Sequence, residues 1–230
     1  MRLTVFNGSP RTSKGNTAIL LGDVISGFTD GEDGSVDAYY LNTKGRRDEA
    51  AAAFAESEVA LLAFPLYHHA MPGIVMTWLE MLEPLDPDRR VKMGFLVQGG
   101  LPEARQSRFV EAFLERLPAR LGCEYLGTVI RGGVEAMRFA PAFMFRGMRR
   151  AFVDLGRELG ASGQLDREII ARLAGTETLP WWRRGFFRTM KALGIADKSW
   201  NSMLKENDCW AGRFDQPYAT AADEPHQGAL

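Results

Sequence analysis

The stretch Leu3-Thr-Val-Phe-Asn-Gly-Ser-Pro-Arg-Thr-Ser-Lys-Gly-Asn-Thr17 passes from a short apolar run into a polar loop and then into a helix-like pattern. The apolar run Leu3–Phe6 is typical of a buried strand. The loop carries several hydroxyl side chains and two cations, Arg11 and Lys14. Backbone N–H groups at a helix start lack internal partners and lie at the positive end of the helix dipole, so the stretch predicts a phosphate site. A loop that only caps the helix is the alternative.

Downstream of this stretch, short apolar runs alternate with helical patterns over about 160 residues. The near-continuous apolar runs are typical of parallel strands that are buried on both faces. The predicted strands are Leu3–Phe6, Val36–Leu41, Val59–Phe64, Val91–Val97 and Tyr125–Ile130. The predicted helices are Thr17–Ile25, Asp48–Ala55, Ile74–Leu82, Ser107–Leu121 and Ala142–Leu159. This order predicts a doubly wound α/β fold with a five-stranded parallel sheet, whose ligands bind beyond the carboxyl ends of the strands.

Residues 161–230 show no second sheet pattern. We therefore expect two domains, an α/β domain over 1–160 and a helical C-terminal extension over 161–230. Within the extension, Trp181–Lys191 combines four cations and four aromatic rings with no acidic residue. Three interpretations stay open for this stretch: packing on the domain or a partner subunit, binding of an anionic cosubstrate, and contact with a membrane surface. The small, polar tail beyond Tyr218 is expected to fray.

Composition excludes several classes of protein. The chain has 230 residues with 28 Lys and Arg against 29 Asp and Glu, a net charge of −1, whereas nucleic-acid binders are usually far more basic. The cysteines, Cys123 and Cys209, are isolated and form no metal-binding pattern, so we expect no metal and a reduced, cytoplasmic protein. No apolar run approaches the roughly 18 to 20 residues that span a bilayer.

The first loop does not match other common phosphate-binding motifs. A Walker loop requires Gly-x-x-x-x-Gly-Lys-Ser/Thr, but here six residues separate Gly8 from Gly15 and Asn16 follows. The dinucleotide fingerprint Gly-x-Gly-x-x-Gly is also absent, and the loop holds no cysteine that could act as a phosphatase nucleophile.

Three loops together resemble a known family. Asn7–Thr17 is similar to the phosphate loop of NAD(P)H-dependent FMN reductases of the flavodoxin-like group, which commonly reads Gly-Ser-Pro-Arg and then Gly-Asn-Thr. Phe64-Pro-Leu-Tyr-His-His-Ala-Met-Pro-Gly73 resembles the family's Pro-x-Tyr loop, and Gln98-Gly-Gly100 stands at the place of its small glycine-rich loop. The resemblance covers residues 1–160. The chain departs from the family in the helix Ile74–Glu80, where many members carry a Leu-Lys pair, and at Gln98, which replaces a small residue.

The resemblance implies an FMN site in which the flavin carries the chemistry. No catalytic residue is certain, although Tyr67 and His68 are possible contacts of the electron acceptor. The residues implied in phosphate binding are Ser9, Arg11, Ser13, Asn16 and Thr17. Those implied around the flavin ring are Pro65, Leu66, Tyr67 and His68, with Gln98, Gly99 and Gly100 at its polar edge. From the residues alone, Tyr67 and His68 also suit packing roles, and Gly99–Gly100 suits a simple turn.

The resemblance also implies an activity. The expected function is hydride transfer from NADPH or NADH to FMN and electron transfer to a small acceptor such as a quinone, a nitro or azo compound, or a flavin. Two alternatives remain, namely a flavodoxin-type electron carrier and a flavin-free binding or regulatory protein on the same fold. A homodimer is expected because flavodoxin-like reductases are often dimers.

Overall fold

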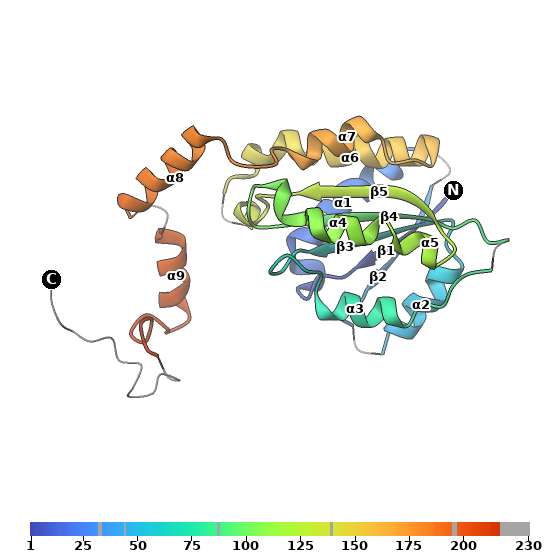
Figure 1. Cartoon of the computed structure of the whole chain (residues 1–230), viewed down its shortest axis with the longest axis horizontal. Coiled ribbons are helices and arrows are strands. Elements are labelled where there is room, and N and C mark those ends of the chain that lie inside the picture. The colour runs from blue at the N-terminus through green and yellow to red at the C-terminus, as the bar shows by residue number, and fades with distance from the viewer. Residues whose placement is uncertain (32–33, 44, 87, 139, 195–196, 217–230) are drawn as a thin grey trace. The chain divides into compact units, whose positions relative to one another are not determined.

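The computed structural model describes residues 1–31, 34–43, 45–86, 88–138, 140–194 and 197–216, shown in Figure 1. The chain divides into two compact units, Met1–Thr178 and Leu179–Leu230. The predicted fraying of the tail beyond Tyr218 concerns residues outside the described part. The predicted boundary between residues 160 and 161 stays a prediction, although the helix Arg167–Ala174 packs within the first unit.

The first unit is built on a parallel sheet of five strands, as the sequence predicts. The strands are β1 (Arg2–Asn7), β2 (Ser35–Tyr40), β3 (Val59–Pro65), β4 (Lys92–Gln98) and β5 (Glu124–Arg131). Their order is β2-β1-β3-β4-β5, and every neighbouring pair is parallel. This is the flavodoxin-like order, in which the direction of winding changes between β1 and β3. The continuous apolar run of β3 is buried along its whole length, because helices cover both faces of the sheet.

Each face of the sheet packs against its own layer of helices (Figure 1). One layer contains α1 (Asn16–Phe28), α6 (Arg146–Ser162) and α7 (Arg167–Ala174). The opposite layer contains α2 (Arg47–Ala55), α3 (Gly73–Glu80), α4 (Arg108–Leu114) and α5 (Leu117–Arg120). The side chains of Phe6, Phe54 and Trp78 pack together in the second layer, with the ring centres of Phe6 and Trp78 4.6 Å apart. The two cores therefore fix the sheet edge from which the functional loops project.

Helices α1 and α6 approach each other closely because each contributes a glycine at the contact. A Cβ atom on Gly27 would lie 1.8 Å from the carbonyl oxygen of Val153, and one on Gly156 would lie 1.9 Å from that of Val24. Arg149 on α6 also donates two hydrogen bonds, of 2.7 and 2.9 Å, to the carboxylate of Asp23 on α1. The pair fixes α1, whose N-terminus borders the loop Gly8–Gly15.

Two predicted helices are divided in the structure. The stretch predicted as one helix over Ser107–Leu121 consists of a 3₁₀ turn over Ala104–Ser107 followed by α4 and α5. Pro118 explains the break, because it has no N–H to donate to the carbonyl of Leu114 and its ring collides with that group. Likewise, the predicted helix Ala142–Leu159 begins with a 3₁₀ turn over Ala142–Phe145 and continues as α6.

The second unit is helical, as expected for the C-terminal region. It contains α8 (Trp181–Ala192) and α9 (Lys198–Glu206). Among the helices of the described residues, none is both long and apolar enough to cross a membrane.

Candidate functional site

The loops that follow β1, β3 and β4 meet at the carboxyl edge of the sheet, beside the change of winding between β1 and β3. A small cavity of about 70 Å³ lies between them, and a second of about 200 Å³ adjoins it. Both are lined by Leu66, Gly99 and Gly100, so they form one continuous depression. In sheets of this type, ligands bind at this edge.

The loop after β1 is a compact turn. The hydroxyl oxygen of buried Ser9 accepts a hydrogen bond of 3.3 Å from the backbone N–H of Arg11. Gly15 completes the turn, and a Cβ atom there would lie 2.8 Å from the Ser9 hydroxyl. No side chain caps the first turn of α1 within the described residues, so the positive end of that helix faces the loop.

Asn16, the first residue of α1, holds a buried polar atom without a partner. Its amide nitrogen donates to the carbonyl oxygen of Val134 at 3.0 Å and lies 3.5 Å from the carboxylate of Glu135. These two acceptors fix the orientation of the amide, and its Oδ1 atom, buried in the described structure, accepts no hydrogen bond there. A buried carbonyl oxygen in this state favours a ligand that offers an O–H or N–H group.

Thr17 and Gln98 contact each other. The Thr17 side chain is fully buried, and its hydroxyl oxygen accepts a hydrogen bond of 3.1 Å from the amide of Gln98, which is also buried. The bond joins the start of α1 to the end of β4. The Thr17 side chain therefore connects the start of α1 to the residue that precedes the loop after β4, and its backbone N–H lies at the helix start.

The loop after β3 forms a tight hairpin. Tyr67 and Ala70 exchange two backbone hydrogen bonds of 2.9 Å, while His68 and His69 between them have φ angles of +46° and +64°. Two consecutive positive φ angles define a turn that normally uses Asn or Gly, so this backbone is strained. The ring nitrogen Nδ1 of His69 lies 3.2 Å from the carbonyl oxygen of Gln106, which holds the turn against the loop after β4. The Tyr67 side chain stays 45% exposed.

The loop after β5 completes the depression, and the sequence analysis missed its role. The backbone N–H of Val134 donates to the carbonyl oxygen of Gly99 at 3.2 Å. The adjacent Glu135 lines the smaller cavity, with its carboxylate 3.6 Å from the guanidinium of Arg11. No sequence pattern indicates this contact, because its partners, Arg11 and Asn16, lie more than a hundred residues earlier.

The structure brings most of the predicted residues together. The smaller cavity is lined by Ser9, Arg11, Asn16, Pro65, Leu66, Tyr67, Gln98, Gly99 and Gly100, and the larger one by His68. Ser13 is exposed and Thr17 is buried, and neither lines these cavities. Among the described residues, no group of three or more His, Cys, Asp or Glu side chains is arranged to hold a metal ion.

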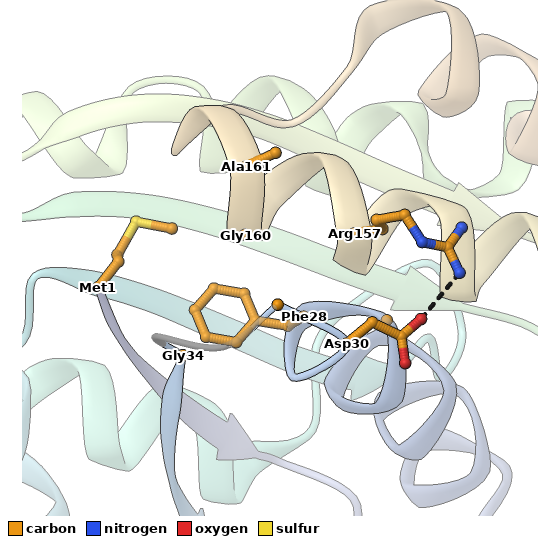
Figure 2. Close-up of a pocket in the computed structure, with 9 residues that line it drawn as sticks. Met1, Phe28, Asp30, Gly34, Arg157, Gly160 and Ala161 are labelled. Atoms are coloured by element: carbon orange, nitrogen blue, oxygen red, sulfur yellow. Dashed lines mark hydrogen bonds and ion pairs between the residues drawn. The ribbon is translucent and has the colours of Figure 1, made fainter.

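A separate cavity of about 370 Å³ lies at the opposite edge of the sheet, between the C-terminal ends of α1 and α6 (Figure 2). Glycines and the rings and methyl groups of Met1, Phe28 and Ala161 line most of it. The charged groups, Arg157 and Asp30, bind each other across its rim at 2.8 Å. This pair satisfies both charges, and the other side chains that line the cavity are apolar.

The fold is shared with solved structures of reductases. The chain matches an NADH:FMN oxidoreductase at 14% identity and a TM-score of 0.55, with 78% of this chain and 96% of that one aligned. An FMN-dependent NADH-azoreductase from Bacillus anthracis, solved with FMN, matches at 11% identity and a TM-score of 0.52, covering 70% of this chain and 100% of that one. An NAD(P)H:quinone oxidoreductase from Methanothermobacter marburgensis matches at 13% identity and a TM-score of 0.55, covering 69% and 96%.

No protein-family model matches the sequence, and no curated protein matches it at a significant level. At identities of this size, structural likeness establishes the fold and leaves the activity to be argued from the site. The predicted flavodoxin-like α/β fold is confirmed by both the strand order and these neighbours.

Proposed function

We propose that the chain is an oxidoreductase that binds FMN, takes a hydride from NADPH or NADH, and passes electrons to a small acceptor. The observation that carries this proposal is the convergence of the three loops beside the uncapped start of α1. The solved structures of the same fold support it, because they include an NADH:FMN oxidoreductase, an FMN-dependent NADH-azoreductase and an NAD(P)H:quinone oxidoreductase.

The described residues suit the phosphate end of FMN. Arg11 supplies a half-exposed cation, buried Ser9 supplies a hydroxyl, and the first backbone N–H groups of α1 supply donors next to a positive dipole. Exposed Ser13 would add a hydroxyl from the loop, and Thr17 would contribute through its backbone. The unpartnered Oδ1 atom of Asn16 suits a hydroxyl of the sugar-like chain better than the phosphate, because both Oδ1 and phosphate accept hydrogen bonds.

The remaining loops suit the flavin ring. Pro65, Leu66, Tyr67 and His68 would flank the ring, and the backbone of Gly99 and Gly100 would approach its polar edge. A Cβ atom on Gly99 would meet only the Leu66 side chain, at 4.0 Å, so a flat group has space against this backbone. The hairpin Tyr67–Ala70 is already closed by its own hydrogen bonds, which lowers the entropy that ring binding must overcome.

FMN, when bound, would supply the hydride-accepting chemistry, and the chain positions the reactants. The nicotinamide loses two electrons and one proton as a hydride. A quinone acceptor gains two electrons and two protons, the second proton coming from solvent, and becomes a quinol. The exposed side chains of Tyr67 and His68 would border the acceptor and restrict its orientation. Nitro and azo compounds and free flavins are further acceptors of the same class.

One contact favours a second candidate function. Glu135 places a carboxylate against Arg11 and the Asn16 amide, in the region assigned to the phosphate. A carboxylate there repels a phosphate, as expected of a flavin-free binding or regulatory protein on this fold. A flavodoxin-type carrier is the third candidate, and it would bind FMN without oxidising NADPH or NADH.

Two expectations about the cell remain part of the proposal. We propose a cytoplasmic homodimer with no nucleic-acid partner. The exposed aromatic side chains of Phe109 and Phe113, one turn apart on α4, offer apolar surface for a subunit contact. Light scattering on the purified protein tests this assembly.

The function is tested by loading the purified protein with FMN, removing the excess, and recording the visible spectrum before and after anaerobic NADPH or NADH. We expect the protein to retain the yellow colour of FMN, to lose it when NADPH or NADH is added, and to regain it when a quinone is added. A yellow protein that is bleached by neither NADPH nor NADH would contradict the reductase and favour the electron carrier. A protein that stays colourless would contradict FMN binding and favour the flavin-free candidate.

A further inference from the structure

The helix α8 concentrates aromatic rings and positive charge without any acidic side chain. Between Leu179 and Gly194 the chain contains Arg183, Arg184, Arg188 and Lys191, and no Asp or Glu. Within the second unit this helix buries none of its residues. Such a composition is unusual for a helix that packs on protein, where charges are normally mixed.

Three of the four cations of α8 and four of its apolar side chains occupy different faces of the helix. Helical spacing places Trp182, Phe186, Met190 and Leu193 in one stripe. The same spacing places Arg184, Arg188 and Lys191 in another stripe. A short helix with an aromatic face, a basic face and low overall hydrophobicity has the properties of a helix that lies in a membrane interface.

Rings and cations are also paired in three dimensions throughout the second unit. The guanidinium of Arg183 lies 5.2 Å from the ring centre of Trp182. Farther along, the guanidinium of Arg213 lies 4.0 Å from the ring of Trp210 and 4.6 Å from that of Phe214. Each pair holds a cation beside an aromatic ring, and both kinds of group suit the membrane–water interface.

We propose that α8 docks the protein on an anionic membrane surface. The aromatic stripe enters the boundary between headgroups and acyl chains, and the basic stripe faces the lipid phosphates. Charge complementarity selects this occupant, because a second copy of α8 would bring four more cations against the same four. A helix packed on its own first unit is the competing arrangement, and it is an outcome of the test below.

The last residues of the first unit, just before the chain enters the second unit, lie beside the candidate site. Thr176 and Glu177 accept backbone hydrogen bonds of 3.0 and 3.3 Å from Ala104 and Arg105 in the 3₁₀ turn after β4. Glu177 is also paired with Arg108. The same turn contributes Gln106 and Ser107 to the larger cavity, so the chain leaves the first unit beside it.

This connection points to an acceptor dissolved in the membrane, a lipid-soluble quinone, and that part of the inference rests on the proposed function. The quinone would take two electrons from NADPH or NADH by way of the flavin, and two protons, to become a quinol. Membrane docking itself is independent of any flavin.

Flotation of the full-length protein with vesicles tests the docking. The protein should float with mixed phosphatidylcholine–phosphatidylglycerol vesicles, float poorly with pure phosphatidylcholine, and release at high ionic strength. The double variant Arg184→Gln/Arg188→Gln should bind the anionic vesicles about 30-fold more weakly. Its matched control is Arg116→Gln/Arg120→Gln, an exposed pair of the same spacing in the first unit, and it should bind normally.

The aromatic stripe is tested in the same way. Phe186→Ser should weaken flotation, whereas Phe143→Ser, which alters a 66% exposed ring in the 3₁₀ turn before α6, should not. Absence of flotation, equal binding to neutral vesicles, or equal losses in variants and controls would overturn the proposal. A change in oligomeric state confined to the α8 variants would assign the helix to a second copy. If none of the variants lost flotation, α8 would not be the membrane-binding element. The helix would then be assigned to packing on the first unit.

Activity measurements separate the two proposals. If both are correct, the α8 variants oxidise NADPH or NADH normally with a water-soluble quinone and slowly with a long-chain quinone held in anionic vesicles. If the α8 variants reduced both quinones at equal rates, the proposal that the acceptor is dissolved in the membrane would be overturned. Failure to bind FMN, together with normal flotation, would overturn the proposed function and leave the docking intact.

Discussion

Replacing Arg11 with Gln should weaken FMN binding strongly while changing stability little. In the free protein, Arg11 is paired with Glu135 at 3.6 Å, and the two side chains are 48% and 49% exposed. An exposed pair of this kind contributes about 0–1 kcal/mol. Against a phosphate the same guanidinium makes a charge-assisted hydrogen bond, which contributes about 1.5–3 kcal/mol. The expected loss of affinity is therefore about 10- to 150-fold.

Flavin fluorescence quenching measures this loss, and two further variants make it specific. Arg46→Gln is the matched control, because Arg46 forms a comparable pair with Glu49, with side chains 55% and 58% exposed, away from the site. Glu135→Gln removes the carboxylate that opposes the phosphate and should tighten binding about fivefold, since two like charges about 4 Å apart in water repel by about 1 kcal/mol. An unchanged dissociation constant for Arg11→Gln, or weaker binding for Glu135→Gln, would refute the reasoning.

Three further predictions concern packing, reactivity and pH. Gly156→Ala should lower the free energy of unfolding by about 1–3 kcal/mol, because the added methyl group meets a backbone carbonyl of α1. The control Gly147→Ala, on the open side of α6, should leave that free energy unchanged. Equal urea midpoints for the two variants would contradict this prediction. Iodoacetamide at mildly alkaline pH should label exposed Cys209 and spare Cys123, because burial raises the pKa of the Cys123 thiol to about 11. Equal labelling rates of the two cysteines, measured by mass spectrometry, would be inconsistent with that burial. The hydrogen bond from Arg108 lowers the pKa of Glu177 from 4.5, so the ion pair between them is present above that value and is lost as the pH falls through the lowered pKa. Hydrogen exchange around residues 176–178 should therefore increase on acidification. Exchange that instead increases with rising pH beyond its intrinsic rate would contradict this pH dependence.

The sheet could be predicted because its central strands, β1, β3 and β4, are almost entirely buried. Runs such as Val59–Phe64 are apolar at every position, which is typical of a parallel sheet covered by two helix layers. The apolar pattern predicted the boundaries of the helices less well than those of the strands. The periodicity of Ser107–Leu121 continues through Pro118, so the apolar pattern favoured one helix while the missing N–H of Pro118 divided it.

The site was predictable where its residues are consecutive in the sequence. The first two loops combine a strand end, a turn and a helix start within a few residues, and the physical requirements of phosphate binding can be read from them. The contacts from Asn16 to Val134 and Glu135 were not predictable, because they join residues over a hundred positions apart. For the same reason the sequence did not show that the Thr17 hydroxyl is bonded to Gln98.

The most direct test of the central claim compares the affinities of FMN and riboflavin, which differ only in the phosphate. If the loop Asn7–Thr17 binds that phosphate through at least two charge-assisted contacts of about 1.5–3 kcal/mol each, FMN should bind more than about 100-fold more tightly than riboflavin. Equal affinities, or no binding of either flavin, would contradict the claim that this edge of the sheet is an FMN site.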